Sequence, residues 1–264
     1  MNFVLLILAL NYLLACSLPN TNKSGINRKV DVYNLKDNSG QYLLKREIGL
    51  TKNNEVVAKV IVSDSKGNLS RPSERIVSIS SYGQLKTNKK SVRALRPKTS
   101  AYQLWLEGKK HSNKIRINLE SKSLDVSLNS PIMEWNGKRN FKFPKDNPLF
   151  CFYSQLVECA SVTSFLKNAV EKKQGKMNFY LIWNGYPFFS EMYANIPRKL
   201  FSKAELIYES EISSEEHRFS LNVENQKMFY HIGQGKNLEK FFWVSQGLSL
   251  IKKTKAGKKE KKKI

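Results

Sequence analysis

The stretch KIRINLESKSLDVSL, residues 114–128, decides the fold class of this chain. Each half of it alternates apolar with polar residues, with Ile115, Ile117 and Leu119 in the first half and Leu124, Val126 and Leu128 in the second. Alternate residues of a β-strand point to opposite faces, so each half predicts a strand with one covered and one solvated face. Half-covered strands of this kind are typical of antiparallel sheets.

The same period of two recurs along most of the chain. It predicts further strands at residues 41–50, 56–62, 75–80, 101–107, 177–183, 204–211, 219–223, 227–232 and 241–250. Asn136-Gly137 and Asn184-Gly185 each favour a two-residue hairpin turn, because both residues tolerate the positive φ angles that such turns need.

One helix interrupts this pattern after residue 160. Apolar residues recur there at helical spacing: Val162, Phe165, Leu166, Ala169 and Val170. Ser161 favours an N-cap and Gly175 favours the end of the helix. We therefore expect a mainly β fold. It is a single curved antiparallel sheet, either a half-barrel or an open barrel-like meander, with one or two helices covering a face.

The first residues of the chain predict export. Residues 3–10 are apolar, and Leu13-Leu14-Ala15-Cys16 follows shortly before polar Ser17. This order resembles the lipobox of bacterial lipoproteins. In that family the chain is cut before the cysteine, which carries diacylglycerol and usually a further acyl chain such as palmitate. The resemblance implies a signal peptide at residues 1–15, lipidation at Cys16 and, because Ser17 is not Asp, sorting to the outer membrane.

Two other interpretations of this segment fit less well. A membrane-spanning helix needs about 20 apolar residues, whereas Asn11 and Pro19 interrupt the run. An ordinary secretory signal peptide suits the length of the hydrophobic segment, but it gives Cys16 no role.

With Cys16 assigned to lipid, Cys151 and Cys159 remain as an even pair in an oxidising compartment, which favours a disulfide. Asn147 and Pro148 favour a helix start just before Cys151. An unbroken helix would hold the two Cα atoms about 12 Å apart, and a disulfide tolerates at most about 7 Å. Either the helix breaks and the bond forms, which we favour, or the helix continues and both thiols are free.

Composition favours one globular domain with a polar segment at each end. The chain has 264 residues, of which 41% are hydrophobic, and a formal net charge of +23. We expect a lipid-anchored flexible tether at residues 16–29, a β-rich domain at 30–251 and a disordered lysine-rich tail at 252–264. The tail residues that we expect to contact an anionic surface are Lys252, Lys253, Lys258, Lys259, Lys261, Lys262 and Lys263.

Such a charge attracts polyanions without selecting among them. In an exported protein the expected partners are anionic phospholipid, lipopolysaccharide or another envelope polymer, and no nucleic acid. An alternative without a binding function stays open, in which the lysines only keep the sheet soluble and prevent its edges from pairing with other chains.

Signatures of enzymes are absent from the sequence, which contains no nucleophile elbow, zinc-protease helix, phosphate-binding loop or dinucleotide fingerprint. His217 and His231 could meet across a hairpin and, with Glu215 or Glu216, bind a metal, but they read more simply as solvent-facing strand residues. We expect no enzymatic activity, no cofactor and no metal.

Aromatic residues crowd the segment 179–193 on both faces of the predicted strand. We take four of them as candidate ligand-binding residues: Phe179, Trp183, Tyr186 and Phe188. A second covering layer would explain them equally well without a ligand.

A lipid-anchored, curved antiparallel sheet with a helix across one face resembles the LolA-like half-barrels, whose concave side is an apolar groove for acyl chains. Segment 102–159, with Trp105, Trp135 and the cysteine pair, also resembles uncharacterised periplasmic β-rich domains. Two functional hypotheses follow. The chain binds a lipid or amphiphile in an apolar groove, or it is an anchored interaction protein that holds an anionic envelope polymer or a protein partner through its basic surface.

Overall fold

A computed structural model describes residues 28–51, 55–64, 74–84, 95–106, 108–146 and 148–253. Its centre is one 15-stranded sheet in the order β8-β7-β6-β5-β4-β3-β2-β1-β15-β14-β13-β12-β11-β10-β9. The strands are β1 (Arg28–Asp37), β2 (Gly40–Leu50), β3 (Val56–Asp64), β4 (Glu74–Gln84), β5 (Leu95–Leu106), β6 (Lys109–Asn118), β7 (Ser123–Asn129), β8 (Gly137–Lys142), β9 (Phe150–Phe152), β10 (Lys176–Ile182), β11 (Phe201–Ser213), β12 (Glu216–Val223), β13 (Gln226–Gly233), β14 (Asn237–Trp243) and β15 (Leu248–Lys252). The predicted mainly β fold with one open sheet is confirmed.

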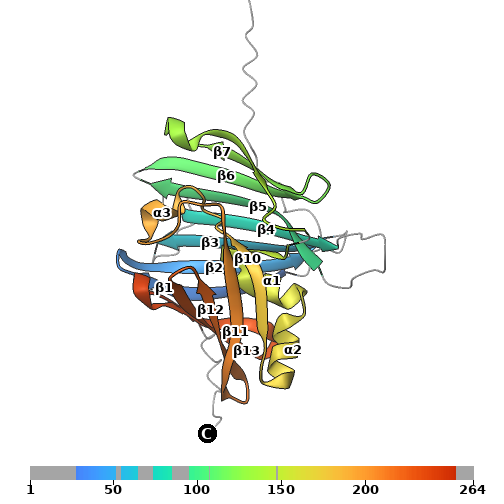
Figure 1. The fold of residues 1–264 in the computed structure, drawn as a ribbon. Helices are drawn as coiled ribbons and strands as arrows, with labels where there is room; N and C mark the ends of the chain where they lie inside the picture. Colours follow the sequence, from blue (N-terminus) through green and yellow to red (C-terminus); the bar gives the residue numbers. More distant parts are fainter. Residues whose placement is uncertain are drawn as a thin grey trace, which may run out of the picture.

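Neighbouring strands of this sheet pair antiparallel, except that β9 runs parallel to β10. The strands from β7 to β1 lie one below the other in Figure 1, and β11 to β13 run at a steep angle to them. The sheet therefore curves strongly, and its two halves enclose a common interior.

The register of β6 and β7 confirms the pair predicted from residues 114–128. Ile115 faces Val126 and Ile117 faces Leu124 across the two strands. Arg116 faces Asp125 on the opposite side of the sheet. The apolar set faces the core, and the charged pair is more exposed.

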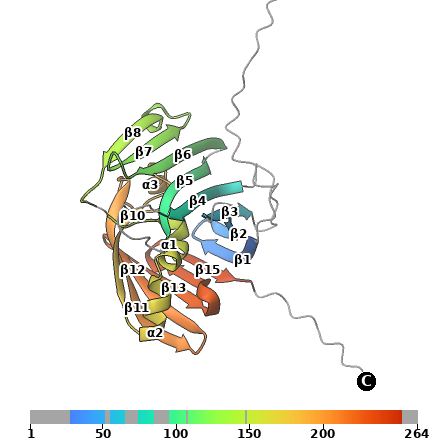
Figure 2. The same ribbon diagram turned by 90° about the vertical axis from the view of Figure 1, so that its right-hand side faces the viewer.

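Among the described residues, three short α-helices complete the fold: α1 (Leu156–Val162), α2 (Phe165–Lys172) and α3 (Phe189–Met192). The turn η4 (Tyr153–Gln155) leads from β9 into α1. Figure 2 shows α1 between the two halves of the sheet. On α2, Phe165 packs its ring against Phe219 of β12. Helices therefore cover a face of the sheet, as the sequence predicted.

The prediction of a single helix after residue 160 is wrong, because two helices meet there. Helix α1 ends at Val162 and α2 begins at Phe165. Between them Ser164 adopts a left-handed conformation with φ of 65°, which breaks the helical hydrogen-bond ladder. The apolar spacing correctly predicts helical structure in this segment, but the sequence contains no strong signal for the break at Ser164.

The strand expected at residues 241–250 is two strands, β14 and β15, because η6 (Val244–Gln246) reverses the chain between them. The strands β1, β8 and β9 were not predicted. Their sequences are polar or short and show no clear alternation. They form strands because they pair with neighbouring strands of the sheet.

The two Asn-Gly hairpins are also wrong. Turn η3 (Met133–Trp135) lies between β7 and β8, and Asn184-Gly185 opens a long connection between β10 and β11 rather than a two-residue hairpin. Asn184 is buried, and its side-chain oxygen accepts a hydrogen bond from the Ser154 amide at 2.9 Å. A Cβ at position 185 would lie 2.6 Å from Cδ2 of Phe189, so close packing requires glycine there. Asn184 and Gly185 still form the centre of a turn, in which the Tyr186 amide donates to the Trp183 carbonyl at 2.9 Å, but this turn does not join two paired strands.

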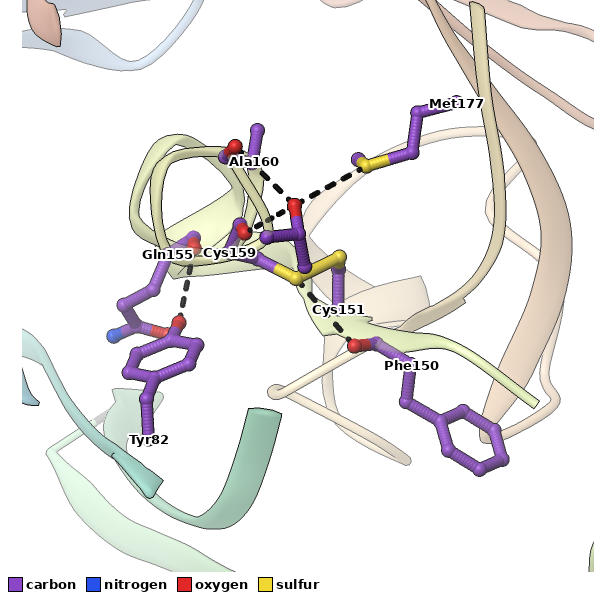
Figure 3. Close-up of a disulfide and its surroundings, with 8 residues drawn as sticks. Tyr82, Phe150, Cys151, Gln155, Cys159, Ala160 and Met177 are labelled. Carbon is purple, nitrogen blue, oxygen red and sulfur yellow. Dashed lines mark hydrogen bonds between the residues drawn. A yellow bond between two sulfur atoms is a disulfide. The ribbon is translucent and has the colours of Figure 1, made fainter. Parts of the chain in front are cut away.

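The disulfide between Cys151 and Cys159 is present in the structure (Figure 3). The chain is extended at Cys151 in β9 and helical at Cys159 in α1, so the helix expected from residue 148 begins only at Leu156. This break brings the two Cα atoms to 5.6 Å. Both cysteines are fully buried, and the bond fixes α1 to the edge strand β9.

The sheet extends slightly beyond the expected domain limits. Strand β1 begins at Arg28, two residues inside the predicted tether. Strand β15 includes Lys252, the first residue of the predicted tail. The Lys252 ammonium group lies 3.0 Å from Glu239 and 3.3 Å from Asp31, so these ion pairs hold it on the sheet.

Candidate ligand-binding cavity

A cavity of about 120 Å³ lies inside the curved sheet. Strands from both halves of the sheet, together with the η4–α1 segment, form its wall. Most of the lining is aliphatic or aromatic and includes Leu35, Val60, Val62, Leu238, Phe241 and Leu250. An engineered cavity of roughly 150 Å³ with similar walls stays dry and binds benzene. This space is therefore large enough for a ring or a short segment of an alkyl chain.

Two charged side chains also line this apolar cavity. Arg46 of β2 and Glu158 of α1 are both 4% exposed and form an ion pair. The Arg46 Nε donates to Glu158 Oε1 at 2.6 Å, and a second guanidinium nitrogen contacts the same oxygen. Burial opposes the charge of Arg46, but the carboxylate of Glu158 outweighs this and raises the pKa of Arg46. The two charges therefore compensate each other in the interior.

The second carboxylate oxygen of Glu158 takes no part in the ion pair. Within the described residues, this buried Oε2 atom has no hydrogen-bond partner. A buried acceptor without a partner costs about 1–3 kcal/mol, and more when it is charged. The ion pair is thus incomplete on the carboxylate side.

Buried tyrosines lie beside the ion pair or elsewhere in the cavity wall. The Tyr33 hydroxyl donates to the Leu238 carbonyl at 2.8 Å and also contacts Arg46. Tyr153 and Tyr230 line the cavity, and burial raises the pKa of both well above the ordinary value of 10. These hydroxyls stay protonated at neutral pH, so they can donate as well as accept hydrogen bonds.

A buried polar network positions the η4–α1 segment that carries Glu158. The Gln155 side chain donates to Ser78 and accepts from Ser80, each at 2.9 Å. The Tyr82 hydroxyl donates to the Gln155 backbone carbonyl at 2.9 Å, as Figure 3 shows. Asn184 donates to Ser100 at 2.6 Å. Strands β4 and β5 thus hold the start of α1 by hydrogen bonds, and the disulfide holds its middle.

The four candidate ligand residues lie outside the cavity wall and are buried: Phe179, Trp183, Tyr186 and Phe188. The Trp183 indole donates to Ser202 at 3.3 Å, and the Tyr186 hydroxyl accepts from Arg139 at 2.6 Å. Phe188 packs against the rings of His111 and Trp135. Of the same aromatic segment, Phe189 and Tyr193 do line the cavity.

Sequence reasoning missed Arg46, although one signal marks it. Arg46 has the same parity in its strand as Leu44 and Ile48, so alternation places a charge on an apolar face. Glu158 carries a similar signal, because Leu156, Val157, Cys159 and Ala160 around it are buried. Their pairing has no such signal, since the two residues are 112 positions apart.

A second hollow of about 390 Å³ lies by β10 and β11 and is mostly polar. Lys145, Lys203 and Tyr180 are among its lining residues. The Lys145 ammonium group lies 5.9 Å from the centre of the Tyr180 ring, and Lys203 faces Tyr180 across the strand pair. Phe179 is the one residue of the four candidates that borders this hollow.

The two histidines do not form a shared site. His217 pairs in register with buried Ile232, whereas His231 pairs with Arg218, so the two rings lie on opposite faces of the sheet. The ring of His217 is 3.2 Å from the Tyr208 hydroxyl, and that of His231 is 2.7 Å from Glu216. In the part of the chain that the structure describes, no cluster of three or more His, Cys, Asp or Glu side chains could hold a metal ion.

The expected anchor and most of the expected tail cannot be placed. Cys16 and Lys258, Lys259, Lys261, Lys262 and Lys263 lie outside the described residues. Lys253 follows β15, and its backbone amide donates to the Val32 carbonyl at 2.8 Å. None of the helices in the described ranges has the length and apolar composition needed to cross a bilayer.

Comparisons with known proteins add little to this geometry. No protein-family model matches the chain, and no curated protein matches it. A solved structure with a similar arrangement is a β-barrel-like protein of the domain of unknown function DUF1849 from Brucella abortus. It shares 7% sequence identity and superposes with a TM-score of 0.47, covering 86% of this chain and 94% of the other. At these values the likeness carries no argument about a ligand.

Proposed function

We propose that this chain is a non-enzymatic binding protein that holds part of a lipid or another amphiphile in the interior of its curved sheet. One observation carries the proposal: an apolar cavity whose wall contains a single buried ion pair, Arg46–Glu158, among the described residues. Ligand sites are typically apolar hollows with a few convergent polar groups that fix the orientation of the ligand. An apolar core that served stability alone would gain little from a buried ion pair, because desolvation of the two charges offsets their attraction.

The size of the cavity limits what it can hold. About 120 Å³ accommodates a short alkyl segment or a ring rather than several full acyl chains. Leu44, Ile76, Ser154 and Tyr193 of the lining are only half-buried, so the lining reaches solvent and a longer chain can extend out of the cavity. The rest of a long ligand would then lie outside the cavity.

The test is gentle purification of the chain, extraction with organic solvent and mass spectrometry of the extract. The proposal predicts a stoichiometric lipid or amphiphile that Val60→Trp and Val62→Trp exclude, because both residues line the cavity. A matched control is Val30→Trp, since Val30 is exposed on β1 and does not line the cavity. An empty wild-type chain that also fails to take up added amphiphile would refute the proposal.

We further propose that the protein acts at the cell envelope as an outer-membrane lipoprotein anchored through Cys16. The lipobox-like order of residues 13–16 supports this, and two acyl signals hold a protein on a membrane far better than one. A fatty-acid label should enter the wild-type chain and be absent from Cys16→Ala. Equal labelling of both chains would refute the anchor.

A second candidate function is the binding of an anionic envelope polymer or an acidic partner at the outer surface. The net charge of +23 and the polar hollow with Lys145 and Lys203 favour it. This function predicts polyanion binding that salt weakens and that Lys145→Ala with Lys203→Ala reduces, while the content of co-purified lipid stays unchanged. Polyanion binding that both substitutions leave unaltered would remove this hollow as its site.

A further inference from the structure

The charges that line the cavity determine which polar group it can accept. Arg46 and Glu158 are the charged residues among those that line it, and they already neutralise each other. A ligand with a carboxylate or phosphate end would bring a negative charge into this interior without a partner. Burying an uncompensated charge is strongly unfavourable. The interior therefore disfavours anions, although the protein as a whole carries a formal net charge of +23.

The unused hydrogen-bonding capacity of the site points to the complementary group. Oε2 of Glu158 can only accept a hydrogen bond, and within the described part of the chain it receives none. A hydroxyl or amide N–H of a ligand, directly or through a water molecule, would supply the missing donor. The Tyr153 and Tyr230 hydroxyls, which belong to residues of the same lining, can in turn donate to an ester or hydroxyl oxygen.

We infer that the cavity selects amphiphiles whose polar end is uncharged and carries a hydrogen-bond donor, such as a long-chain alcohol or a monoacylglycerol, over the matching fatty-acid anion. The inference rests on the proposed function and names the ligand class of that same site. Hydrophobic burial supplies the affinity for the chain of the ligand, and the Arg46–Glu158 pair supplies the discrimination between polar ends.

The experiment compares decanol with decanoate, which share a chain and differ in charge at neutral pH. Binding to the purified full chain, freed of bound lipid, is measured from the quenching of tryptophan fluorescence or by titration calorimetry. We expect decanol to bind at least about tenfold more tightly than decanoate, which corresponds to about 1.4 kcal/mol.

The variant Glu158→Gln tests the cause of this preference. It leaves the Arg46 charge without a counter-charge, so decanoate should gain affinity relative to decanol and the order should reverse. Glu171→Gln is the matched control, because Glu171 is an exposed residue of α2 whose change alters the net charge equally. The control should keep the wild-type preference.

The outcomes separate the inference from the function on which it rests. If neither ligand binds the wild-type chain, the proposed function fails and the inference falls with it. If both bind, but equally well or with decanoate the tighter, the selectivity is refuted while the amphiphile-binding function stands. The wild-type comparison decides this even if Glu158→Gln does not fold.

Discussion

The ion pair between Arg46 and Glu158 should be far more costly to break than to remove. The two side chains are 5% and 3% exposed, so solvent does not screen the charge that is left when one partner is lost. We predict that Arg46→Met and Glu158→Leu each lower the free energy of unfolding by about 3–5 kcal/mol, because each leaves a buried charge unpaired. The double variant should lie within about 2 kcal/mol of wild type, or above it.

Urea unfolding followed by tryptophan fluorescence measures these differences, because Trp183 and Trp243 are fully buried and report the packed interior. The midpoint should shift at an unchanged slope if the denatured state is unaffected. The exposed pair Lys167–Glu171, at 3.7 Å on α2, is the control. Removing either partner there should cost less than about 0.5 kcal/mol.

The interaction energy of the double-mutant cycle is the decisive quantity. The reasoning requires that the two single losses sum to much more than the loss in the double variant. If Arg46→Met and Glu158→Leu each cost less than about 1 kcal/mol and add up in the double variant, the pair is not desolvated as described. The inferred ligand selectivity would then have no physical basis.

Three further predictions concern the rest of the fold. Replacing Cys151 and Cys159 by alanine should lower the free energy of unfolding by about 2–3 kcal/mol, since the bond closes a loop with a sequence separation of 8; two alkylatable thiols in the unreduced wild type would contradict the bond. Deleting residues 254–264 should leave the unfolding midpoint unchanged and weaken sedimentation with anionic vesicles, mainly at low salt; equal sedimentation would make this segment a solubility device. Burial raises the pKa of Glu216, but hydrogen bonds, first from Lys240, outweigh this and lower it, so this carboxylate stabilises the fold above its unfolded pKa of about 4.3 and the benefit is lost as the pH falls through the lower folded value. Glu216→Gln should therefore cost up to about 1 kcal/mol near neutral pH and less once the pH falls below the unfolded pKa of about 4.3, measured as the difference in urea midpoint; a difference that does not shrink on acidification would contradict this.

Local alternation was enough to predict the class of fold. Each strand such as β6 or β7 shows its covered face in its own sequence, and one face of a half-buried strand must be apolar. Strand β1 cannot be predicted in this way, because charged residues such as Arg28, Lys29 and Asp31 interrupt its apolar positions. Its place in the centre of the sheet depends on the two neighbours that it pairs with.

The site was less accessible to sequence reasoning than the fold. The aromatic cluster was recognised, but the identity of its cavity-facing members depends on where the chain turns after Trp183. Asn184 there contributes its side chain to Ser154 and Ser100 instead of forming a hairpin. The local preference of Asn-Gly for a turn is kept. Hydrogen bonds to distant segments determine where the chain goes after this turn, and the local sequence carries no signal for them.

The order of the strands has a consequence for how the chain folds. Strand β1 is the first described strand. It pairs with β2 on one side and with β15, the last described strand, on the other. The Tyr33 hydroxyl bonds to the Leu238 carbonyl across 205 positions. Until the last strands have emerged from the ribosome, one edge of β1 has no partner, and contacts of such long sequence separation form slowly. An unpaired edge invites association with other chains, so assembly of this sheet is expected to depend on protection of the β1 edge during synthesis. Nascent chains stalled before residue 237 should aggregate through this edge.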